Sequence, residues 1–527
     1  MLVLTGQDCK DLEIALKKEW LEGNRLNAYS YGNLYLQNNK NEHGLLVIPR
    51  QGTKLTVVSS LIEKFTVGDK TCYTNFYRTS EKQAFLDKFS IDYGPHFIYH
   101  FYSLRLERSL LLLQEKNAVV IRYRGLEQET DVPFVIQPLL SLKEYNALKK
   151  TEEKKFEVVK EENYIKYSDE TGINLFFYFK DCEFTPCREY LPYGDENYLI
   201  PGSFAFTLKK ENDVFLIVAA ERLKDVEVDE AFDREMKSRQ NILKDLNIKN
   251  ELYKNMTLSS SFYLSRVRNQ YEIKESLIHP KTSFQVLLNS TSLLFSLKKP
   301  DVIKEILIFL SRNIKKGLVP DRIDPSTGAF QYDSIDNSFW YLLFLYDFIE
   351  YTGDWKFIKD FLWENLRSVF YEYTNTILHT RLDSDGLLIN TEKLNTGKMI
   401  EYEKGKNLSL NILWYNAVRI LEMLGAKFAD IDLHSKADEA GSQIRKNLYL
   451  KFWNKSGNYL NTVIDVPPMN ETDDSFRPHQ ILALSLPFDD LLHVKTKSYI
   501  LDRVKEKLLT PFGLRTLSVD SPSYIRS

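Results

Sequence analysis

The residue types that most often build metal or redox sites are few and scattered in this sequence. Of the four cysteines only Cys182 and Cys187 lie close together, as Cys-Glu-Phe-Thr-Pro-Cys, and no second pair completes the spacing of a zinc site. His43 and His479 stand apart from any cluster of Asp or Cys residues. We therefore expect reduced thiols, structural roles for both histidines, and neither a metal nor a cofactor.

Motifs for nucleotide and acyl chemistry are also missing, since the sequence has no Gly-rich phosphate loop and no Gly-x-Ser-x-Gly elbow. Lys and Arg number 70 against 73 Asp and Glu, so the net charge of -3 shows no basic excess for nucleic acid. Aromatic residues are frequent, with 31 Tyr and 32 Phe. Some could form flat platforms for sugar rings, although most are expected to fill cores.

The elements that must position any site differ along the chain. Up to about residue 222, short segments rich in β-branched and aromatic residues alternate with turn clusters, which predicts a β-sandwich whose strand order cannot be read. These segments include 44–48, 55–58, 97–102, 118–123 and 214–218. Residues 223–257 are mostly charged, with apolar residues at helical spacing, and they predict a helical linker.

From residue 258 to residue 527 the pattern is helical almost throughout. Eight helices are predicted, at 286–297, 302–314, 338–351, 355–378, 408–424, 435–450, 478–486 and 499–509. Gly317, Gly353, Gly425 and Gly457 stand where helices are expected to stop. Helix pairs joined by loops can stack as a solenoid or close into a toroid, and periodicity does not choose between the two.

Two sets of segments carry a family resemblance. The N-terminal set is Glu19-Trp20-Leu21, Tyr29 with Gly32, His43-Gly-Leu-Leu-Val47, Gln137-Pro-Leu139 with Tyr145-Asn-Ala-Leu148, and Tyr198-Leu-Ile-Pro-Gly-Ser-Phe204. The more specific C-terminal set is Gly317-Leu-Val-Pro-Asp-Arg322, Tyr332-Asp-Ser-Ile-Asp-Asn-Ser-Phe-Trp340, Asn411-Ile-Leu-Trp-Tyr-Asn-Ala417, Arg477-Pro-His-Gln-Ile-Leu-Ala-Leu-Ser-Leu-Pro487 and Leu509-Thr-Pro-Phe-Gly-Leu-Arg-Thr-Leu517. In order and spacing, from about residue 19 onward, they resemble the glycogen debranching enzymes of the archaeal and bacterial type.

With the boundaries given above, the resemblance implies that the N-terminal part (1–222) is a β-sandwich and that the part after the helical linker (223–257) is an (α/α)6-toroid glycoside hydrolase domain (258–527). It also implies inverting hydrolysis of α-1,6-linked branch glucose in glycogen. An inverting glycosidase uses two carboxyl groups roughly 6.5–9.5 Å apart, one as general acid and one as general base. The acid must keep its proton near neutral pH, which burial or a neighbouring charge achieves.

The sequence departs from the family pattern at three places. The family's Trp-Gly-Arg-Asp segment has no counterpart within residues 271–289. Counting back from Trp414 puts Asn390-Thr391-Glu392-Lys393 where the family has the Trp-Met-Asp of its acid, so Glu392 keeps a carboxylate without the aromatic neighbour. The chain ends at Ser527, before the family's base, so we expect a divergent and incomplete toroid with eight helices where closure takes twelve.

Candidate site residues follow from the resemblance. Glu392 is the candidate general acid, and its alternative is a solvated loop carboxylate. The candidates for substrate binding are Arg322, Asp336, Trp340, Asn411, Trp414, Tyr415, Arg477 and Gln480. Asp336 could instead cap a helix, Trp414 could belong to a core, and the other polar candidates could be buried groups that fix loops. Glu471, Asp473 and Asp474 could supply a base opposite Glu392, and we expect that they do not.

Two functions of different classes fit these residues. One is an amylo-α-1,6-glucosidase whose activity is reduced or lost, and the other is a non-catalytic α-glucan-binding or scaffold paralogue. The segment 477–487 argues against a third, a helical-solenoid interaction protein. The expected partner is glycogen or another α-glucan, without nucleic acid or membrane, and an incomplete toroid predicts self-association. Neither a signal peptide nor a membrane-length apolar run is visible, so we expect a cytoplasmic location.

Overall fold

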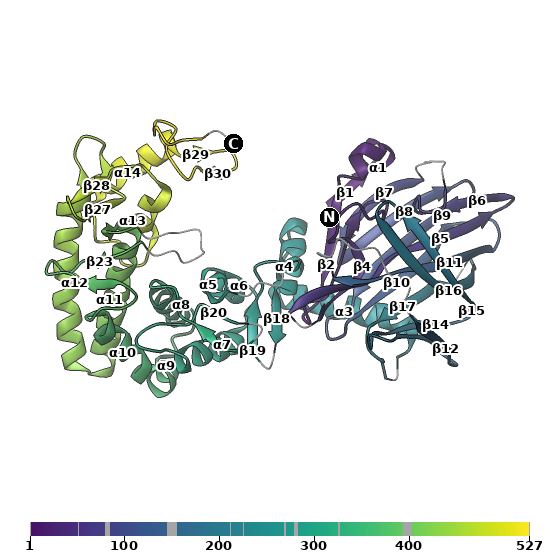
Figure 1. Ribbon diagram of the computed structural model, residues 1–527, viewed down its shortest axis with the longest axis horizontal. Coiled ribbons are helices and arrows are strands. Elements are labelled where there is room, and N and C mark those ends of the chain that lie inside the picture. Colours follow the sequence, from purple (N-terminus) through teal and green to yellow (C-terminus); the bar gives the residue numbers. More distant parts are fainter. Residues whose placement is uncertain are drawn as a thin grey trace. The chain divides into compact units, whose positions relative to one another are not determined.

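The computed structural model describes residues 2–50, 52–79, 85–144, 155–210, 212–224, 226–267, 270–278, 283–324, 327–393 and 403–525. The segment 145–148, quoted above, lies outside them. The chain divides into two compact units, Met1–Thr282 and Ser283–Ser527. The first is built largely of strands and the second mainly of helices (Figure 1). The predicted order, a β-sandwich followed by a helical domain, is confirmed.

Two antiparallel sheets form most of the first unit. One has the order β1 (Leu2–Thr5), β7 (Leu86–Asp92), β8 (Gly94–Phe101), β9 (Leu104–Leu112), β10 (Ala118–Glu127), β17 (Val214–Ala219), β14 (Asn174–Phe179), β13 (Tyr164–Asp169), β12 (Phe156–Lys160). The other has the order β15 (Glu183–Tyr193), β16 (Glu196–Leu208), β11 (Val132–Glu144), β5 (Thr53–Val67), β4 (Gly44–Arg50), β3 (Tyr29–Asn33), β2 (Glu19–Gly23), with β6 (Lys70–Tyr73) beside β5. The helices α1 (Gln7–Lys10) and α2 (Leu12–Ala15) connect β1 to β2.

Aromatic side chains and one enclosed ion pair fill the space between the sheets. Phe65 stacks on Phe134 with ring centroids 4.9 Å apart, because β5 and β11 are paired with these residues opposite each other. Arg108 Nε lies 2.7 Å from Glu63 Oε1, and their side chains are 1% and 0% exposed. Thr74 Oγ1 donates to the other Glu63 oxygen at 2.6 Å. The charge of Glu63 is therefore compensated inside the core.

Two helices follow the sandwich within the first unit. They are α3 (Val228–Leu246) and α4 (Glu251–Tyr263), and the hairpin of β18 (Leu264–Val267) and β19 (Gln270–Ile273) follows them. Arg239 of α3 fixes this helix to the sandwich: its Nη2 lies 2.5 Å from Glu22 Oε1 and 3.0 Å from the carbonyl oxygen of Leu112. The segment predicted as a linker thus falls on α3 and the start of α4, which pack on strands.

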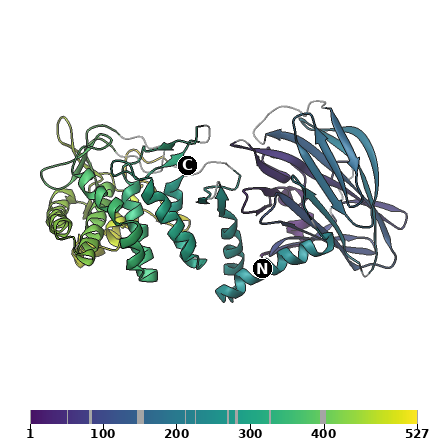
Figure 2. The same ribbon diagram turned by 90° about the horizontal axis from the view of Figure 1, so that it is seen from below.

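The second unit carries its helices in sequence as α5 (Phe284–Asn289), α6 (Thr291–Ser296), α7 (Pro300–Arg312), α8 (Asn337–Thr352), α9 (Trp355–Phe361), α10 (Trp363–Tyr373), α11 (Leu408–Phe428), α12 (Ile431–Phe452), η1 (Pro478–Ile481), α13 (Leu482–Ser485) and α14 (Val494–Lys507). Several of them run roughly side by side (Figure 2). Among the helices described, none combines the length and apolar character needed to cross a bilayer.

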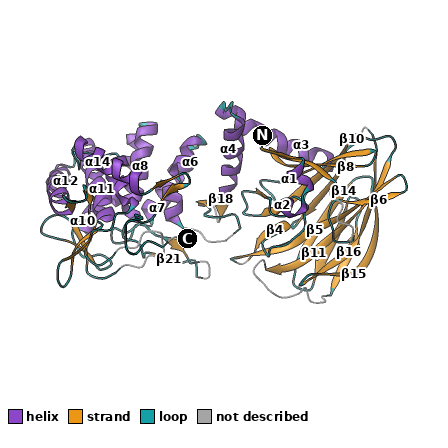
Figure 3. Cartoon of the chain, turned by 90° about the horizontal axis from the view of Figure 1, so that it is seen from above, coloured by secondary structure: helices purple, strands orange, loops and turns teal. Residues whose placement is uncertain are grey.

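Short hairpins connect these helices. Their strands are β20 (Arg322–Ile323), β21 (Phe330–Gln331), β22 (Thr380–Leu382), β23 (Leu388–Asn390), β24 (Lys406–Asn407), β25 (Trp453–Asn454), β26 (Tyr459–Leu460), β27 (Val463–Val466), β28 (Glu471–Asp473), β29 (Leu509–Thr510) and β30 (Gly513–Leu514). Figure 3 shows strands and loops gathered at one end of the helices of this unit.

Helices α8 and α11 form the centre of the second unit. Both are apolar on nearly every side, which is typical of a helix enclosed by others. Phe339 of α8 contacts Trp414 of α11 at a centroid distance of 5.5 Å, and Tyr373 of α10 lies 5.7 Å from the same indole. The two helices therefore begin close together, at the end of the unit that carries the hairpins.

Four details of the predicted helices are wrong. The segment 286–297 breaks at Ser290, within a polar Asn-Ser-Thr run of weak helix formers, and 355–378 breaks at the buried Leu362. The last helix begins earlier than predicted, at Val494. Gly353 does end α8 with a φ of 65°, but Gly425 lies inside α11. A Cβ at Gly425 would stand 3.0 Å from a backbone nitrogen of α12, so this glycine permits close helix packing.

The enclosed ion pair gives a stability prediction. Arg108→Ala leaves Glu63 buried without its cation, so we expect the free energy of unfolding to fall by about 3–5 kcal/mol. Arg105→Ala, on the same strand, removes the exposed pair with Glu127 and should cost less than about 1 kcal/mol. Urea unfolding followed by far-UV circular dichroism measures both. Equal losses in the two variants would contradict the prediction.

Candidate functional site

The predicted site residues lie on the hairpins and helix starts of the second unit (Figure 3). Arg322 is in β20, Asp336 immediately precedes α8, and Trp340 is in its first turn. The remaining candidates lie on or near α11, η1 and β23: Asn411, Trp414, Tyr415, Arg477, Gln480 and Glu392. The β24–β27–β28 sheet and the bridge between Asn390 and Gly405 bring the loops around β23 together.

A buried ammonium group holds these loops. The side chain of Lys406 is 1% exposed, and its Nζ lies 2.8 Å from Asp383, 2.6 Å from Asp385 and 2.8 Å from Asp465. The first two aspartates form the turn between β22 and β23, whereas Asp465 is in β27. Lys451 reaches Asp385 from α12 at 2.6 Å. Two cations thus offset three carboxylates that would otherwise repel one another.

The opposite charges in this cluster favour the ionised carboxylates of Asp383 and Asp385 and the protonated amine of Lys406. The hydrogen bond from Lys406 is the main reason that the pKa of Asp383 falls to about 2. For Asp385, burial acts to raise the pKa, but the hydrogen bonds from Lys406 and Lys451 lower it overall. Burial likewise opposes the charge of Lys406, and its three carboxylate partners outweigh that effect, so its pKa is raised. Among the described residues no group of His, Cys, Asp and Glu is arranged to hold a metal ion.

Two of the predicted sugar-binding amides bond to the protein backbone. Asn411 Oδ1 accepts from the amide nitrogen of Leu388 at 2.7 Å, and its Nδ2 donates to the carbonyl of the same residue at 3.0 Å. Gln480 bonds to the backbone of Leu460 in the same way: its Oε1 accepts from the amide nitrogen at 2.9 Å, and its Nε2 donates to the carbonyl at 2.6 Å. Both amides are wholly buried. Each fixes a short strand, β23 or β26, against a helix.

Asp336 is also buried, and its carboxylate orders the entry into α8. Ser334 Oγ donates to its Oδ1 at 2.6 Å, and Trp340 Nε1 donates to its Oδ2 at 3.1 Å. No backbone amide of the helix bonds to this side chain, although Asp336 occupies the N-cap position. The hydrogen bond from its indole to Asp336 holds Trp340 in a fixed orientation.

Arg322 is more exposed, and its Nη2 lies 3.1 Å from Asp333.

Trp414 and Tyr415 are enclosed by protein. Trp414 packs among Phe339, Phe370 and Tyr373, with its side chain fully buried. The hydroxyl of Tyr415 donates to Asp490 Oδ1 at 2.6 Å, and burial raises its pKa. Both side chains contribute packing between α11 and its neighbours.

Glu392 and Arg477 lie nearer the surface. The side chain of Glu392 is 67% exposed, with its Oε2 3.8 Å from His379 Nδ1. The backbone of Thr391 bonds to the carbonyl of His379 at 2.8 Å, which sets the course of this loop. Arg477 Nε donates to Ser475 Oγ at 3.1 Å. General acids are usually enclosed, because a low dielectric keeps the proton on the carboxyl group.

Trp340 also lines a hollow of about 570 Å³ beside α8. Leu343, Phe344 and Asp347 line it from the same face of the helix, and Leu486 and Pro487 line it from the segment after α13. Burial, assisted by the charge of Glu350, raises the pKa of Asp347. The hollow combines an aromatic surface with a carboxyl group, which suits a sugar ring.

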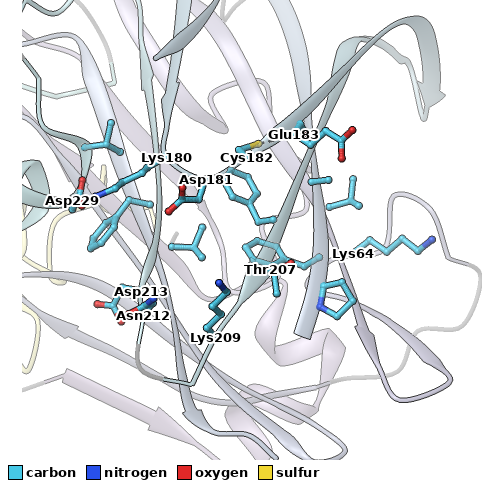
Figure 4. Close-up of a pocket in the computed structure, with 18 of the residues that line it drawn as sticks. Lys64, Lys180, Asp181, Cys182, Glu183, Thr207, Lys209, Asn212, Asp213 and Asp229 are labelled. Atoms are coloured by element: carbon cyan, nitrogen blue, oxygen red, sulfur yellow. Dashed lines mark hydrogen bonds and ion pairs between the residues drawn. The ribbon is translucent and has the colours of Figure 1, made fainter. Parts of the chain in front are cut away.

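The first unit has a larger hollow, of about 730 Å³, between strands of both sheets and the start of α3 (Figure 4). Its charged residues are partly matched: Lys180 Nζ lies 2.6 Å from Asp229, and Arg124 Nη2 lies 2.6 Å from Asp213. Thr207 and Lys209 are also among its lining residues. None of the catalytic or substrate-binding residues predicted from the sequence lines this hollow.

Sequence reasoning did not single out the Lys406 cluster. Asp383 and Asp385 stand in an Asp-Ser-Asp-Gly turn, which alone indicates only a tight connection. The partners Lys406 and Asp465 are 59 residues apart, and no spacing rule joins them. Asp347 was missed for a different reason, since one acidic residue on an apolar helix gives a weak signal.

Comparison with known proteins follows the same division of the chain. Residues 18–215 match the family described as the N terminal of glycogen debranching enzyme, and residues 286–527 match the family described as amylo-alpha-1,6-glucosidase. Comparison with curated proteins gives no match.

Among solved structures, a bacterial glucoamylase complexed with acarbose superposes with a TM-score of 0.56 at 11% identity, covering 95% of this chain and 80% of that one. A putative kojibiose phosphorylase from human microbiome gives a TM-score of 0.45 at 9% identity, over 88% of this chain and 71% of that one. The chain therefore has a glucoamylase-like fold.

The Lys406 cluster gives a pH-dependent prediction. Asp383 has a folded pKa below its unfolded value of about 4, so its stabilisation is present above pH ~4 and is lost as the pH falls towards 2. Lys406→Met leaves three carboxylates facing one another, and at pH 7 it should destabilise the protein by about 3–5 kcal/mol. Because acid neutralises these carboxylates, the difference in Tm between variant and parent should shrink from pH 7 to pH 3.

Lys451→Met is the matched control, since its side chain is 38% exposed and touches two of the same aspartates. We expect a loss of about 1 kcal/mol or less. Differential scanning calorimetry across this pH range measures both variants. A Lys406→Met deficit that stays constant with pH would show that charge repulsion is not its cause.

Proposed function

Since the chain belongs to the glycogen debranching enzyme (amylo-α-1,6-glucosidase) family, we propose that it recognises branched α-glucans of the glycogen type. The hairpin-bearing end of the second unit, where α8 and α11 begin, is the proposed binding surface. The family match supports the choice of ligand. The likeness in fold to a glucoamylase solved with acarbose supports recognition of carbohydrate by a domain of this kind.

The proposed roles of the site residues follow their exposure. Arg322, Trp340 and Arg477 are not enclosed, so they can offer hydrogen bonds and one aromatic face to sugar rings. The buried candidates position these groups and do not touch the glucan themselves: Asp336, Asn411, Trp414, Tyr415 and Gln480. Trp340 connects the two sets, because Asp336 holds its indole.

Hydrolysis of α-1,6-linked glucose would place Glu392 as the general acid that protonates the leaving glycosidic oxygen. A second carboxylate would activate water on the opposite face of the sugar, with inversion at the anomeric carbon. We assign no residue to that second role. This activity is the alternative function, and family membership is the observation that favours it.

The exposure of Glu392 favours binding over efficient hydrolysis. A carboxyl group with 67% of its side chain in contact with solvent lacks the enclosure that usually prepares a general acid. We therefore propose a glucan-binding protein on a glycosidase fold, with little or no debranching turnover.

Glucose release from a phosphorylase-limit dextrin, measured beside co-sedimentation with glycogen, separates the two functions. We expect retention on glycogen, slow glucose release, and no change in either for Glu392→Gln. The control is Glu403→Gln, a nearby carboxylate that pairs with Lys393. Rapid release that falls by about 10²–10⁴-fold in Glu392→Gln alone would establish the hydrolase instead.

Trp340 provides a test of the binding surface. Trp340→Ala removes the proposed aromatic face, and we expect the affinity for glycogen to fall by about tenfold, the equivalent of about 1.4 kcal/mol. Trp355→Ala is the control, because this tryptophan begins α9, after α8 has ended, and contacts Phe428 at the last residue of α11, away from the ends where α8 and α11 begin. Unchanged retention of Trp340→Ala would exclude this surface, and absence of retention by the parent protein would exclude glucan binding.

A further inference from the structure

A small polar pocket in the first unit carries features of a binding site. Its volume is about 190 Å³, below the range of about 300–1,000 Å³ that holds drug-sized ligands. We propose that it binds one neutral hexopyranose ring, the terminal glucosyl residue of an α-glucan. The pocket size and chemistry indicate the neutral sugar, whereas its identity as glucose rests on the function proposed above.

Strands β5, β11, β15 and β16 and one loop build the pocket. Thr56 comes from β5 and Lys143 from β11, and these two residues are paired across the strands. Glu196 comes from the start of β16, and the loop 38–43 closes another side. Near it lies a small hydrophobic cluster, separate from the main core, of Ile62, Tyr77, Leu139, Tyr198 and Ile200.

The loop is held in place by buried hydrogen bonds. His43, which is 2% exposed, has its Nε2 3.1 Å from Glu19 Oε1. Asn38 Nδ2 donates to the carbonyl of Ser59 at 3.0 Å. The pocket is therefore preformed, so the entropic cost of ordering its residues when a ligand binds is small.

Charges lining the pocket cancel one another. Lys143 contacts Glu196 directly, and Lys40 Nζ lies 2.6 Å from Glu19 Oε1, so both lining cations are paired with a carboxylate. Burial lowers the pKa of His43, so the imidazole is neutral at physiological pH. A lining that is polar yet balanced favours an uncharged ligand with many hydroxyl groups over an anion.

Two lining side chains have unmet hydrogen bonds. Within the part of the chain that the structure describes, Thr56 Oγ1 and Glu196 Oε2 are buried and lack a hydrogen-bond partner. Thr56 is only 1% exposed as a whole residue. Buried polar atoms are normally paired, because an unpaired one loses its bonds to water without replacement. Sugar hydroxyls can donate to the carboxylate oxygen and can either donate to or accept from the threonine.

Tyr193 offers a flat surface at the same pocket. Its ring is half-buried and meets Tyr77 edge-on at a centroid distance of 4.8 Å, which fixes its orientation. Aromatic faces pack well against the C–H face of a pyranose.

The larger hollow of the first unit lacks these features. Among the lining residues shown in Figure 4, none carries a buried polar side-chain atom without a partner. Thr207 lies there on β16 and is exposed. It supplies a control that makes the same chemical change as Thr56→Val at the other hollow.

Titration of the full chain with maltose, by isothermal calorimetry and saturation-transfer NMR, tests the proposal. We expect the parent protein and Thr207→Val to bind equally. Thr56→Val should bind about tenfold more weakly, the loss of about one hydrogen bond, while its Tm stays equal or rises because an unpaired hydroxyl has been removed. Tyr193→Ala should also weaken binding and should reduce saturation transfer to the ring protons.

The outcomes separate this inference from the proposed function. If Thr56→Val binds maltose with unchanged affinity, whatever its Tm, the proposal that this pocket binds a sugar is wrong. A second result would also reject the proposed sugar pocket: Trp340→Ala weakens retention on glycogen, but Thr56→Val does not change the affinity for maltose. That result would leave the proposed function intact. In a third result, Thr56→Val loses maltose binding, whereas Trp340→Ala retains its binding to glycogen. That result would support the pocket and reject the proposed surface on the second unit.

Discussion

The ammonium group of Lys406 is the interaction on which the proposed binding surface depends. It joins the turn between β22 and β23 to β27, through carboxylates that would repel each other without it. Glu392 comes two residues after β23, so the cluster also anchors the strand from which its loop begins. Burying an ion pair gains little net stability over an apolar packing, but it makes one arrangement of the loops much more favourable than others.

Buried amides complete the arrangement that the charges begin. Asn411 and Gln480 each satisfy both backbone groups of one leucine, so two irregular strands can be buried without unpaired polar atoms. This device explains why polar residues occur within otherwise apolar segments. It also separates two kinds of candidate: amides that hold the surface, and exposed groups such as Trp340 and Arg477 that can meet a ligand.

Several buried ions of the first unit are also paired with each other. Glu63, Arg108, Glu22 and Arg239 are all buried charges, and each has a charged partner within hydrogen-bond distance. Around the small pocket, by contrast, Thr56 and Glu196 retain unused hydrogen-bonding capacity. Other buried polar atoms of the first unit also lack a partner, but Thr56 and Glu196 line the same pocket, so one ligand can bond to both. The two proposed sites therefore differ in kind, one formed by exposed groups and the other by enclosed ones.

The sequence by itself determined the change from strands to helices, the existence of most helices and the family, because periodicity and short motifs are local properties. It placed α8 and α11 within a few residues of their ends. It did not determine whether Asn411 and Gln480 face a sugar or a backbone, whether Gly425 ends a helix or packs against one, or that Lys406 meets Asp465. Only the tertiary structure decided these, because burial and pairing of a polar group depend on segments that are distant in sequence and adjacent only after folding.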